Sequence, residues 1–181
     1  MGNELQQRLI HLFQWFDPDP DGTHLVSDHS GWWRDPVVLA GLGPALVRPF
    51  RAQRPTVVVA PALTGLIIGP LAATALGVGF VPAYKPDERQ LPGPVSWAQG
   101  PADYRERNVR LGVLDRHLAP GDRVLVVDDW VATGAQLRAI YTICAARGAE
   151  PLGTAAVVDA CPPEVSRKLR IRALLDAARL G

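Results

Sequence analysis

Residues 123–136 constrain the fold more than any other part of the chain. Residues 124–127 are Val-Leu-Val-Val, an apolar run typical of a strand buried on both faces of a parallel sheet. Asp128 and Asp129 follow this run directly. Carboxylates are costly to bury alone, so this pair needs a polar ligand or a cation. We therefore expect both acids at the carboxyl edge of a parallel sheet, where such sheets bind ligands.

The residues that follow the two acids are suited to phosphate. They are small or polar and open a predicted helix over residues 135–147, which would aim backbone N–H groups and the positive helix end at one point. Acids beside such a loop fit a phosphorylated sugar, because carboxylates accept hydrogen bonds from ribose hydroxyls. A capped strand-to-helix turn with solvated aspartates is the alternative. The residues of this phosphate loop are Ala132, Thr133, Gly134, Ala135 and Gln136.

Buried strands alternate with helices along most of the chain. Apolar and β-branched runs predict strands at 56–60, 79–83 and 153–159, besides the strand at 123–127. Apolar residues at helical spacing predict helices at 3–16, 39–48 and 64–76. A basic C-terminal helix is also expected, anchored by leucines between 169 and 180. This alternation predicts one α/β domain over residues 1–181, with a parallel sheet covered by helices on both faces.

Residues 85–108 do not follow this alternation. They contain four prolines, two glycines and many charged residues without an apolar period, which predicts a long exposed loop or flap. A loop of this length in a compact domain usually has a function. Lys85 and Arg89 in this segment are candidates to bind anionic groups, with ordinary solvated loop charge as the alternative.

Composition excludes several classes of partner. Lys and Arg number 19 against 18 Asp and Glu, so the net charge is +1 and no global field favours nucleic acid or an anionic membrane. Only two cysteines occur, Cys144 and Cys161, which argues against a disulfide framework and for a reducing compartment. Prolines and glycines break the longest apolar run, and no secretory signal is visible. We therefore expect a cytoplasmic protein that does not span a membrane.

The stretch over residues 124–136 resembles a known signature. Val-Leu-Val-Val-Asp-Asp-Trp-Val-Ala-Thr-Gly-Ala-Gln looks like the phosphoribosyl pyrophosphate signature of type I phosphoribosyltransferases, which commonly ends Ala-Thr-Gly-Gly-Thr. A looser similarity to the adenine phosphoribosyltransferase branch extends over residues 31–153. There, Trp33-Arg34-Asp35 resembles the Phe-Arg-Asp of that branch. The resemblance implies a Rossmann-like, parallel-sheet type I phosphoribosyltransferase fold, with a small N-terminal hood at about 1–35 and a flexible loop at about 85–108.

The resemblance also implies an activity. Such an enzyme moves 5-phosphoribose from phosphoribosyl pyrophosphate to a ring nitrogen of a purine-like base and releases pyrophosphate, as in purine salvage. Asp128 and Asp129 would hold the ribose hydroxyls, and the phosphate loop would hold the 5′-phosphate. Mg²⁺ would be held mainly by the substrate, with Asp128 and Asp129 as candidate ligands. A homodimer is implied as well.

The chain departs from the family pattern around the pyrophosphate. The adenine branch usually has Asp-Ser-Arg-Gly after the first strand, whereas this chain has Ala62-Leu63-Thr64-Gly65. Leu63, Thr64 and Gly65 could still offer backbone amides, but one positive charge is missing. The catalytic glutamate of the family has no unambiguous counterpart. Glu106 is the candidate if the loop is shifted by one residue, and Arg105 occupies the position if it is not.

The acceptor base is the least constrained part of the ligand. Trp32, Trp33 and Arg34 lie where the adenine branch forms its base pocket, so an indole could stack on a heterocycle while Arg34 reaches its edge. Both indoles could instead belong to the core or to a dimer surface. Two alternative functions remain open. One is a regulator that binds phosphoribosyl pyrophosphate without turnover, and the other is an enzyme of specialised metabolism that ribosylates a non-purine heterocycle.

Overall fold

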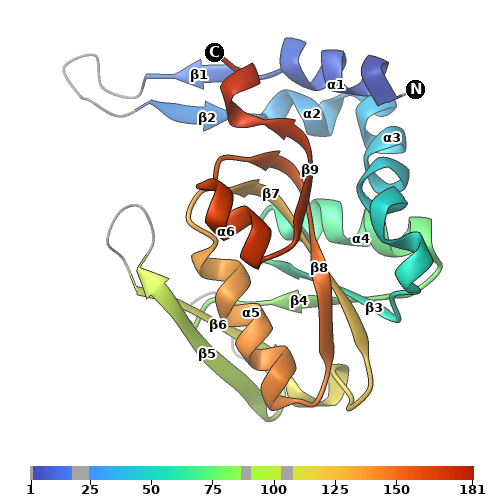
Figure 1. Ribbon diagram of the computed structural model, residues 1–181, viewed down its shortest axis with the longest axis vertical. Coiled ribbons are helices and arrows are strands. Elements are labelled where there is room, and N and C mark those ends of the chain that lie inside the picture. Colours follow the sequence, from blue (N-terminus) through green and yellow to red (C-terminus); the bar gives the residue numbers. More distant parts are fainter. Residues whose placement is uncertain (1, 18–24, 87–90, 103–107) are drawn as a thin grey trace.

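The computed structural model describes residues 2–17, 25–86, 91–102 and 108–181. Its centre is a five-stranded sheet in the order β4-β3-β7-β8-β9, in which all neighbouring strands are parallel (Figure 1). The strands are β3 (Val57–Pro61), β4 (Gly79–Ala83), β7 (Arg123–Val131), β8 (Glu150–Asp159) and β9 (Ile171–Asp176). The predicted α/β class with a parallel sheet is confirmed.

Helices cover both faces of this sheet. The helices α3 and α4 pack on one face, and α5 packs on the other. Alternate residues of β7 enter different cores, because side chains of a strand point to opposite faces. Leu125 and Val127 join the core under α3 and α4, whereas Val124 and Val126 join the core under α5. The bounds are α3 (Pro36–Val47), η1 (Arg48–Gln53), α4 (Gly65–Leu76), η2 (Asp115–His117), α5 (Ala135–Ala146), α6 (Pro163–Lys168) and η3 (Ala177–Arg179).

The N-terminal segment forms a hood over the carboxyl edge of the sheet (Figure 1). It consists of α1 (Gly2–His11), β1 (Gln14–Phe16), β2 (Val26–Asp28) and α2 (Ser30–Arg34). The predicted helix at 3–16 was too long, because residues 14–16 form a strand that pairs antiparallel with β2. The pairing partner, at residues 26–28, lies outside the segment whose spacing predicted a helix, so that spacing alone could not identify it.

The prediction of a structureless loop over residues 85–108 was wrong for its central part. Residues there form β5 (Val95–Ala102), which pairs antiparallel with β6 (Asn108–Leu114). Ala98, Leu111 and Val113 are buried in the core under α5, and this burial stabilises the hairpin. The apolar pattern of β5 is weak, because its buried residues, Ala98 and Gly100, are small. Arg89, Arg105 and Glu106 fall outside the described residues.

The predicted C-terminal helix was also wrong. After the short α6, residues 171–176 form β9, which extends the sheet by pairing with β8. Ile171 and Leu175 are the buried residues of β9, and a spacing of four residues is compatible with either a helix or a strand. Pairing with β8 decides between the two. Within the described ranges, no helix has the length and apolar character needed to cross a membrane.

Candidate active site

Strand β7 carries the two predicted acids at its carboxyl end. Asp128 is 3% exposed, and Asp129 beside it is partly buried. The backbone N–H of Asp129 donates a hydrogen bond of 3.1 Å to Oδ1 of Asp128. The strand continues through both acids to Val131, four residues beyond its predicted end at residue 127. The acids are therefore held by sheet pairing with β8 rather than by a loose turn.

The two carboxyl groups have opposite pKa shifts. Burial raises the pKa of Asp128 well above its ordinary value, and the charge of Asp129 raises it further, while Lys85 acts in the other direction. Burial also acts to raise the pKa of Asp129. A hydrogen bond from His29 and the charge of His29 outweigh burial, so the pKa of Asp129 lies below its ordinary value. The two acids therefore titrate as a coupled pair, in which the surroundings favour the ionised form of Asp129 over that of Asp128.

The predicted phosphate loop has a shape that depends on glycine. Gly134 precedes α5 with φ 70°, a left-handed conformation that glycine adopts easily. A Cβ at Gly134 would also lie 2.5 Å from Cδ1 of Leu169. The backbone N–H of Ala135 donates to Oγ1 of Thr133 at 3.3 Å. The first turn of α5 then has further backbone N–H groups without partners within the helix, which suits an anion.

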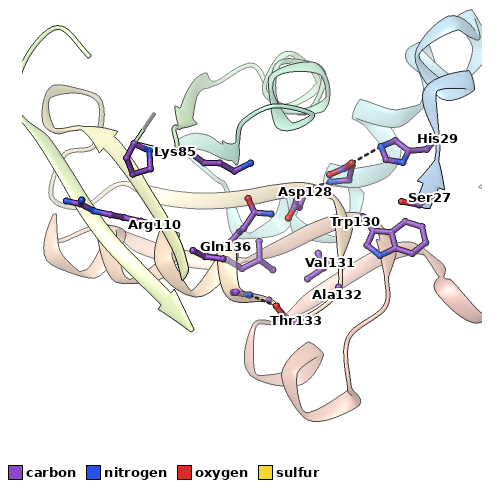
Figure 2. Close-up of a pocket in the computed structure, with 16 residues that line it drawn as sticks. Ser27, His29, Lys85, Arg110, Asp128, Trp130, Val131, Ala132, Thr133 and Gln136 are labelled. Atoms are coloured by element: carbon purple, nitrogen blue, oxygen red, sulfur yellow. Dashed lines mark hydrogen bonds and ion pairs between the residues drawn. The ribbon is translucent and has the colours of Figure 1, made fainter. Parts of the chain in front are cut away.

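The acids and the phosphate loop line one cavity of about 550 Å³ (Figure 2). Lys85 lines it as well, so the structure brings together eight of the residues predicted for the site: Lys85, Asp128, Asp129, Ala132, Thr133, Gly134, Ala135 and Gln136. Four polar or aromatic lining residues were missed by sequence reasoning: Ser27, His29, Arg110 and Trp130. Trp130 could have been found from its place beside the acids, whereas Ser27, His29 and Arg110 carry no local signal.

The loop expected at the pyrophosphate does not line this cavity. Leu63 is 70% exposed, Thr64 is partly buried and precedes α4, and Gly65 is buried against Ala60. None of these three residues is among those that line the cavity. Besides residues 128–137, the cavity is lined by Ser27, His29, residues 85–86 and residues 109–110.

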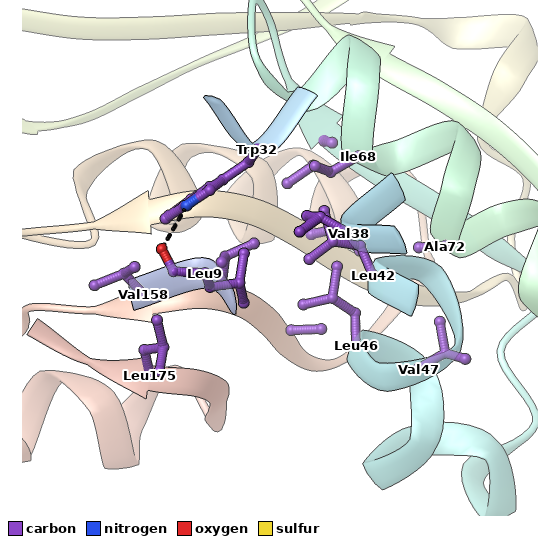
Figure 3. Close-up of a cluster of buried hydrophobic side chains, with 14 of the residues drawn as sticks. Leu9, Trp32, Val38, Leu42, Leu46, Val47, Ile68, Ala72, Val158 and Leu175 are labelled. Carbon is purple, nitrogen blue, oxygen red and sulfur yellow. Dashed lines mark hydrogen bonds between the residues drawn. The ribbon is translucent and has the colours of Figure 1, made fainter. Parts of the chain in front are cut away.

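Trp32, Trp33 and Arg34 also lie away from the cavity lining. Trp32 is fully buried among Leu9, Leu42 and other core residues, and its indole N–H donates to the carbonyl of Leu9 at 2.9 Å (Figure 3). Trp33 is partly buried against the same core, and Arg34 is exposed. To stack on a base, Trp32 would have to leave the core.

Asp35, in the same motif, has a structural role. Its side chain accepts hydrogen bonds from the backbone N–H groups of Val37 and Val38 and so caps α3. It also pairs with Arg8 of α1 at 2.9 Å. Asp35 therefore joins α1 of the hood to the start of α3.

An aromatic wall closes the cavity on the hood side. Trp130 stacks on Phe13, with ring centroids 5.7 Å apart and 20° between the planes. Trp15 meets the same indole edge to face at 5.8 Å, and its own N–H donates to the carbonyl of Gly181 at 2.7 Å. Figure 2 shows Trp130, Ser27 and His29 together on one side of the cavity. A flat apolar ligand could lie against this side.

The fold and the cavity together define a class of protein. An acidic pair and a phosphate loop at the same carboxyl edge of a parallel α/β sheet are typical of proteins that bind nucleotides or sugar phosphates. Residues 46–169 match the family described as phosphoribosyl transferase domain. The chain belongs to this phosphoribosyltransferase family.

Relatives place the chain within the family more closely. It is 40% identical over 135 residues to the adenine phosphoribosyltransferase of Methylococcus capsulatus, covering 75% of this chain and 77% of that protein. It is 32% identical over 161 residues to the enzyme of that name from Streptomyces galbus, covering 89% and 85%. The resemblance to the adenine branch is thus confirmed, and the protein is an adenine phosphoribosyltransferase-like transferase.

Solved structures agree on the fold. The adenine phosphoribosyltransferase of Giardia lamblia, complexed with 9-deazaadenine, has a TM-score of 0.81 at 26% identity, covering 94% of this chain and 97% of that one. The enzyme of Rhodothermus marinus has a TM-score of 0.81 at 24% identity, covering 96% and 99%. The type I phosphoribosyltransferase fold predicted from the sequence is therefore confirmed.

Proposed function

We propose that the protein transfers 5-phosphoribose from phosphoribosyl pyrophosphate to a ring nitrogen of a purine base and releases pyrophosphate. The observation that carries this proposal is a single cavity that holds both a buried acidic pair and a phosphate loop at the start of α5. Adenine is the first acceptor to test, because the relatives are adenine phosphoribosyltransferases.

The acids at the end of β7 fit the ribose, and the phosphate loop that follows them fits its 5′-phosphate. The pKa of Asp129 is lowered and that of Asp128 is raised, so the carboxylate of Asp129 is the better acceptor for a ribose hydroxyl. The backbone N–H groups of the phosphate loop and the positive end of α5 favour a phosphate monoester. A bound phosphoribosyl group would then span from Asp129 to the loop within one cavity.

Mg²⁺ fits the same acidic pair. A buried carboxyl with a raised pKa, as in Asp128, becomes easier to ionise when a cation is near, and carboxylate oxygens are the ligands that Mg²⁺ prefers. Across the described ranges, no group of three or more candidate metal ligands occurs, which supports a metal held mainly by substrate oxygens, with Asp128 and Asp129 as candidate ligands. When bound, Mg²⁺ would screen the charge of the leaving pyrophosphate.

Lys85 is the described side chain best placed to meet pyrophosphate charge. It lines the cavity, and its charge is near enough to lower the pKa of Asp128. From the resemblance, we also propose that Arg89, Leu63, Thr64 and Gly65 belong to the ligand site. Glu106 is the candidate for the catalytic acid of the flap. Catalysis would depend on positioning and on exclusion of water, because water would hydrolyse the same sugar carbon.

We propose Trp130 as the stacking platform for the base. Its indole lines the cavity beside Asp129 and is held from behind by Phe13. Base stacking on an aromatic ring tolerates different heterocycles, so this platform alone would not select adenine. Stacking on Trp32 or Trp33, with Arg34 at the base edge, stays a prediction. Comparison of Trp130→Ala with Trp32→Ala tests whether Trp32 stacks on the base.

A panel of bases tests the function. Wild-type protein would be incubated with phosphoribosyl pyrophosphate, Mg²⁺ and one base at a time, and pyrophosphate release would be measured. Release with adenine or a related purine supports the proposal. Release only with a non-purine heterocycle would instead favour specialised metabolism. Binding of phosphoribosyl pyrophosphate without release for any base would favour a regulator.

A double variant tests the site through the affinity for phosphoribosyl pyrophosphate. Asp128→Asn combined with Asp129→Asn removes two charged acceptors, each hydrogen bond being worth about 1.5–3 kcal/mol. We expect calorimetry at constant Mg²⁺ to show at least about a hundredfold weaker binding of phosphoribosyl pyrophosphate, with the fold intact. Unchanged affinity in the folded double variant would exclude this site.

The assembly and location stay predictions. We propose a homodimer that acts in cytoplasmic purine salvage, with no nucleic-acid or membrane partner. Light scattering after size-exclusion chromatography measures the oligomer, and fractionation of cells measures the location.

A further inference from the structure

His29 contacts Asp129 from the hood. Its Nε2 lies 2.9 Å from Oδ2 of Asp129, and the two side chains are only 17% and 14% exposed. Figure 2 shows the contact reaching from the hood to the end of β7. We infer that His29 is a positioning residue, which fixes one oxygen of Asp129 so that the other can meet a ribose hydroxyl. The inference rests on the proposed function and assigns a further residue to it.

The imidazole is itself held in place. Its ring lies 5.0 Å from the ring of Trp32 and 5.7 Å from that of Trp33, and the two indoles are nearly perpendicular, at 83°. The carbonyl of His29 accepts a hydrogen bond of 3.0 Å from the backbone N–H of Trp32. Before it, Oδ1 of Asp28 accepts from the N–H of Ser30 at 2.9 Å, which fixes the turn. The ring therefore has little freedom to rotate.

Only Nε2 of the imidazole is used in this arrangement. Nδ1 is buried and has no hydrogen-bond partner among the described residues. The contact with Asp129 is thus the sole polar contact of the ring in the described structure, and Nε2–H can donate to the carboxylate in either protonation state. A ring packed against two indoles with one directed donor is suited to orienting a neighbour.

Asp129 needs such an orienting donor more than Asp128 does. The terminal torsion of an aspartate is broad, so an isolated carboxylate samples many orientations. Asp128 is fixed by burial and by the N–H of Asp129. The carboxylate of Asp129 also has hydrogen bonds with the backbone N–H of Trp130 and with Asp128, and His29 adds a side-chain donor from the hood. Asp129 is therefore held from the strand and from the hood together.

This arrangement gives the two hood indoles a role other than base stacking. Trp32 is anchored by Leu9 in the core, and Trp33 packs on the same core. Through His29, these indoles support the carboxylate that we assign to the ribose. The hood then contributes to the phosphoribosyl site as well as to the site of the acceptor base.

The test compares two substitutions of the same residue. His29→Gln keeps an N–H donor near the position of Nε2, whereas His29→Leu removes the donor at similar volume. In His29→Leu we expect the KM and Kd for phosphoribosyl pyrophosphate to rise roughly ten- to hundredfold, while the KM for the base changes less than about twofold. In His29→Gln both should stay within about threefold of wild type. His117→Gln, at an exposed histidine of η2 outside the cavity lining, is the control.

A second comparison remains informative if His29→Leu is poorly folded. His29→Ala should weaken binding of phosphoribosyl pyrophosphate in the wild-type background but have no additional effect on the Kd in the Asp129→Asn background, because the positioned carboxylate is already gone. Equal losses in the Leu and Gln variants, parallel losses for both substrates, or unchanged affinity in a folded His29→Leu would overturn the inference. If wild type itself fails to bind phosphoribosyl pyrophosphate, the proposed function fails first, and the inference falls with it.

Discussion

Substitution of Trp130 should weaken binding of the base, whereas substitution of Trp32 should lower the stability of the fold. Trp130 faces the cavity and is partly exposed, whereas Trp32 is 0% exposed and lies in the core. Trp130→Ala removes a stacking surface worth about 1–3 kcal/mol per base. That range corresponds to about a 5- to 150-fold rise in the Kd for the base. Binding of phosphoribosyl pyrophosphate should change much less, because its proposed contacts are the acids and the phosphate loop.

Trp32→Ala should instead destabilise the whole protein. Replacing a buried tryptophan costs about 3–5 kcal/mol, and the carbonyl of Leu9 would lose its donor. For a domain of this size, about 1 kcal/mol shifts Tm by about 2–4 °C, so we expect a drop of roughly 6–20 °C. Both ligands should then weaken together, because a smaller fraction of the protein is folded.

Titration calorimetry of each ligand, with melting curves alongside, separates these cases. Trp130→Phe is the matched control, because it keeps an aromatic face and should recover most of the affinity for the base. The reasoning is refuted if folded Trp130→Ala binds the base as wild type does. It is also refuted if Trp32→Ala loses base affinity alone at an unchanged Tm, which would place the base against the hood indoles.

Two further predictions concern the phosphate loop and the cysteines. Gly134→Ala forces a left-handed φ of 70° and a contact with Leu169, so calorimetry should show about tenfold weaker binding of phosphoribosyl pyrophosphate. Gly121→Ala, at φ 86° with open space for a Cβ, should cost stability but not affinity. Burial raises the pKa of Cys144 and of Cys161 to about 12, so both thiols stay protonated at pH 8. Mass spectrometry should show native alkylation by iodoacetamide at least about tenfold slower than in unfolded protein, and rapid labelling of either thiol would contradict this.

Local sequence signals predicted the parts of the fold that depend on neighbouring residues. The strand at 79–83 and the helix that begins at Ala135 were found at or near their observed bounds, because an apolar run and a glycine-led helix start are local features. The hairpin of β5 and β6 and the edge strand β9 were not found. Their stability comes from pairing and burial against distant segments, which a single sequence does not reveal.

The same distinction holds for the candidate site. Asp128, Asp129 and the phosphate loop are contiguous, so one motif was enough to place them together. His29 precedes Asp129 by a hundred residues, and nothing in its own surroundings marks it as a neighbour of the acids. Trp32 and Trp33 were associated with the base by motif position. Their contacts instead tie them to the core and to the imidazole.

Among the described residues, positive charge is scarce where pyrophosphate is expected to bind. At the start of α4, where the family pattern has an arginine, this chain has Thr64, and the exposed side chains nearby are those of Leu63, Leu66 and Ile67, which cannot screen an anion. The described cations that line the cavity are Lys85 and Arg110, and Arg110 lies over the ring of Trp97 at 5.0 Å. The site that we propose for the 5′-phosphate offers neutral N–H donors. Among the described residues, Lys85 is the side chain that we assign to the charge of pyrophosphate, so we expect affinity for the intact donor to depend steeply on Mg²⁺.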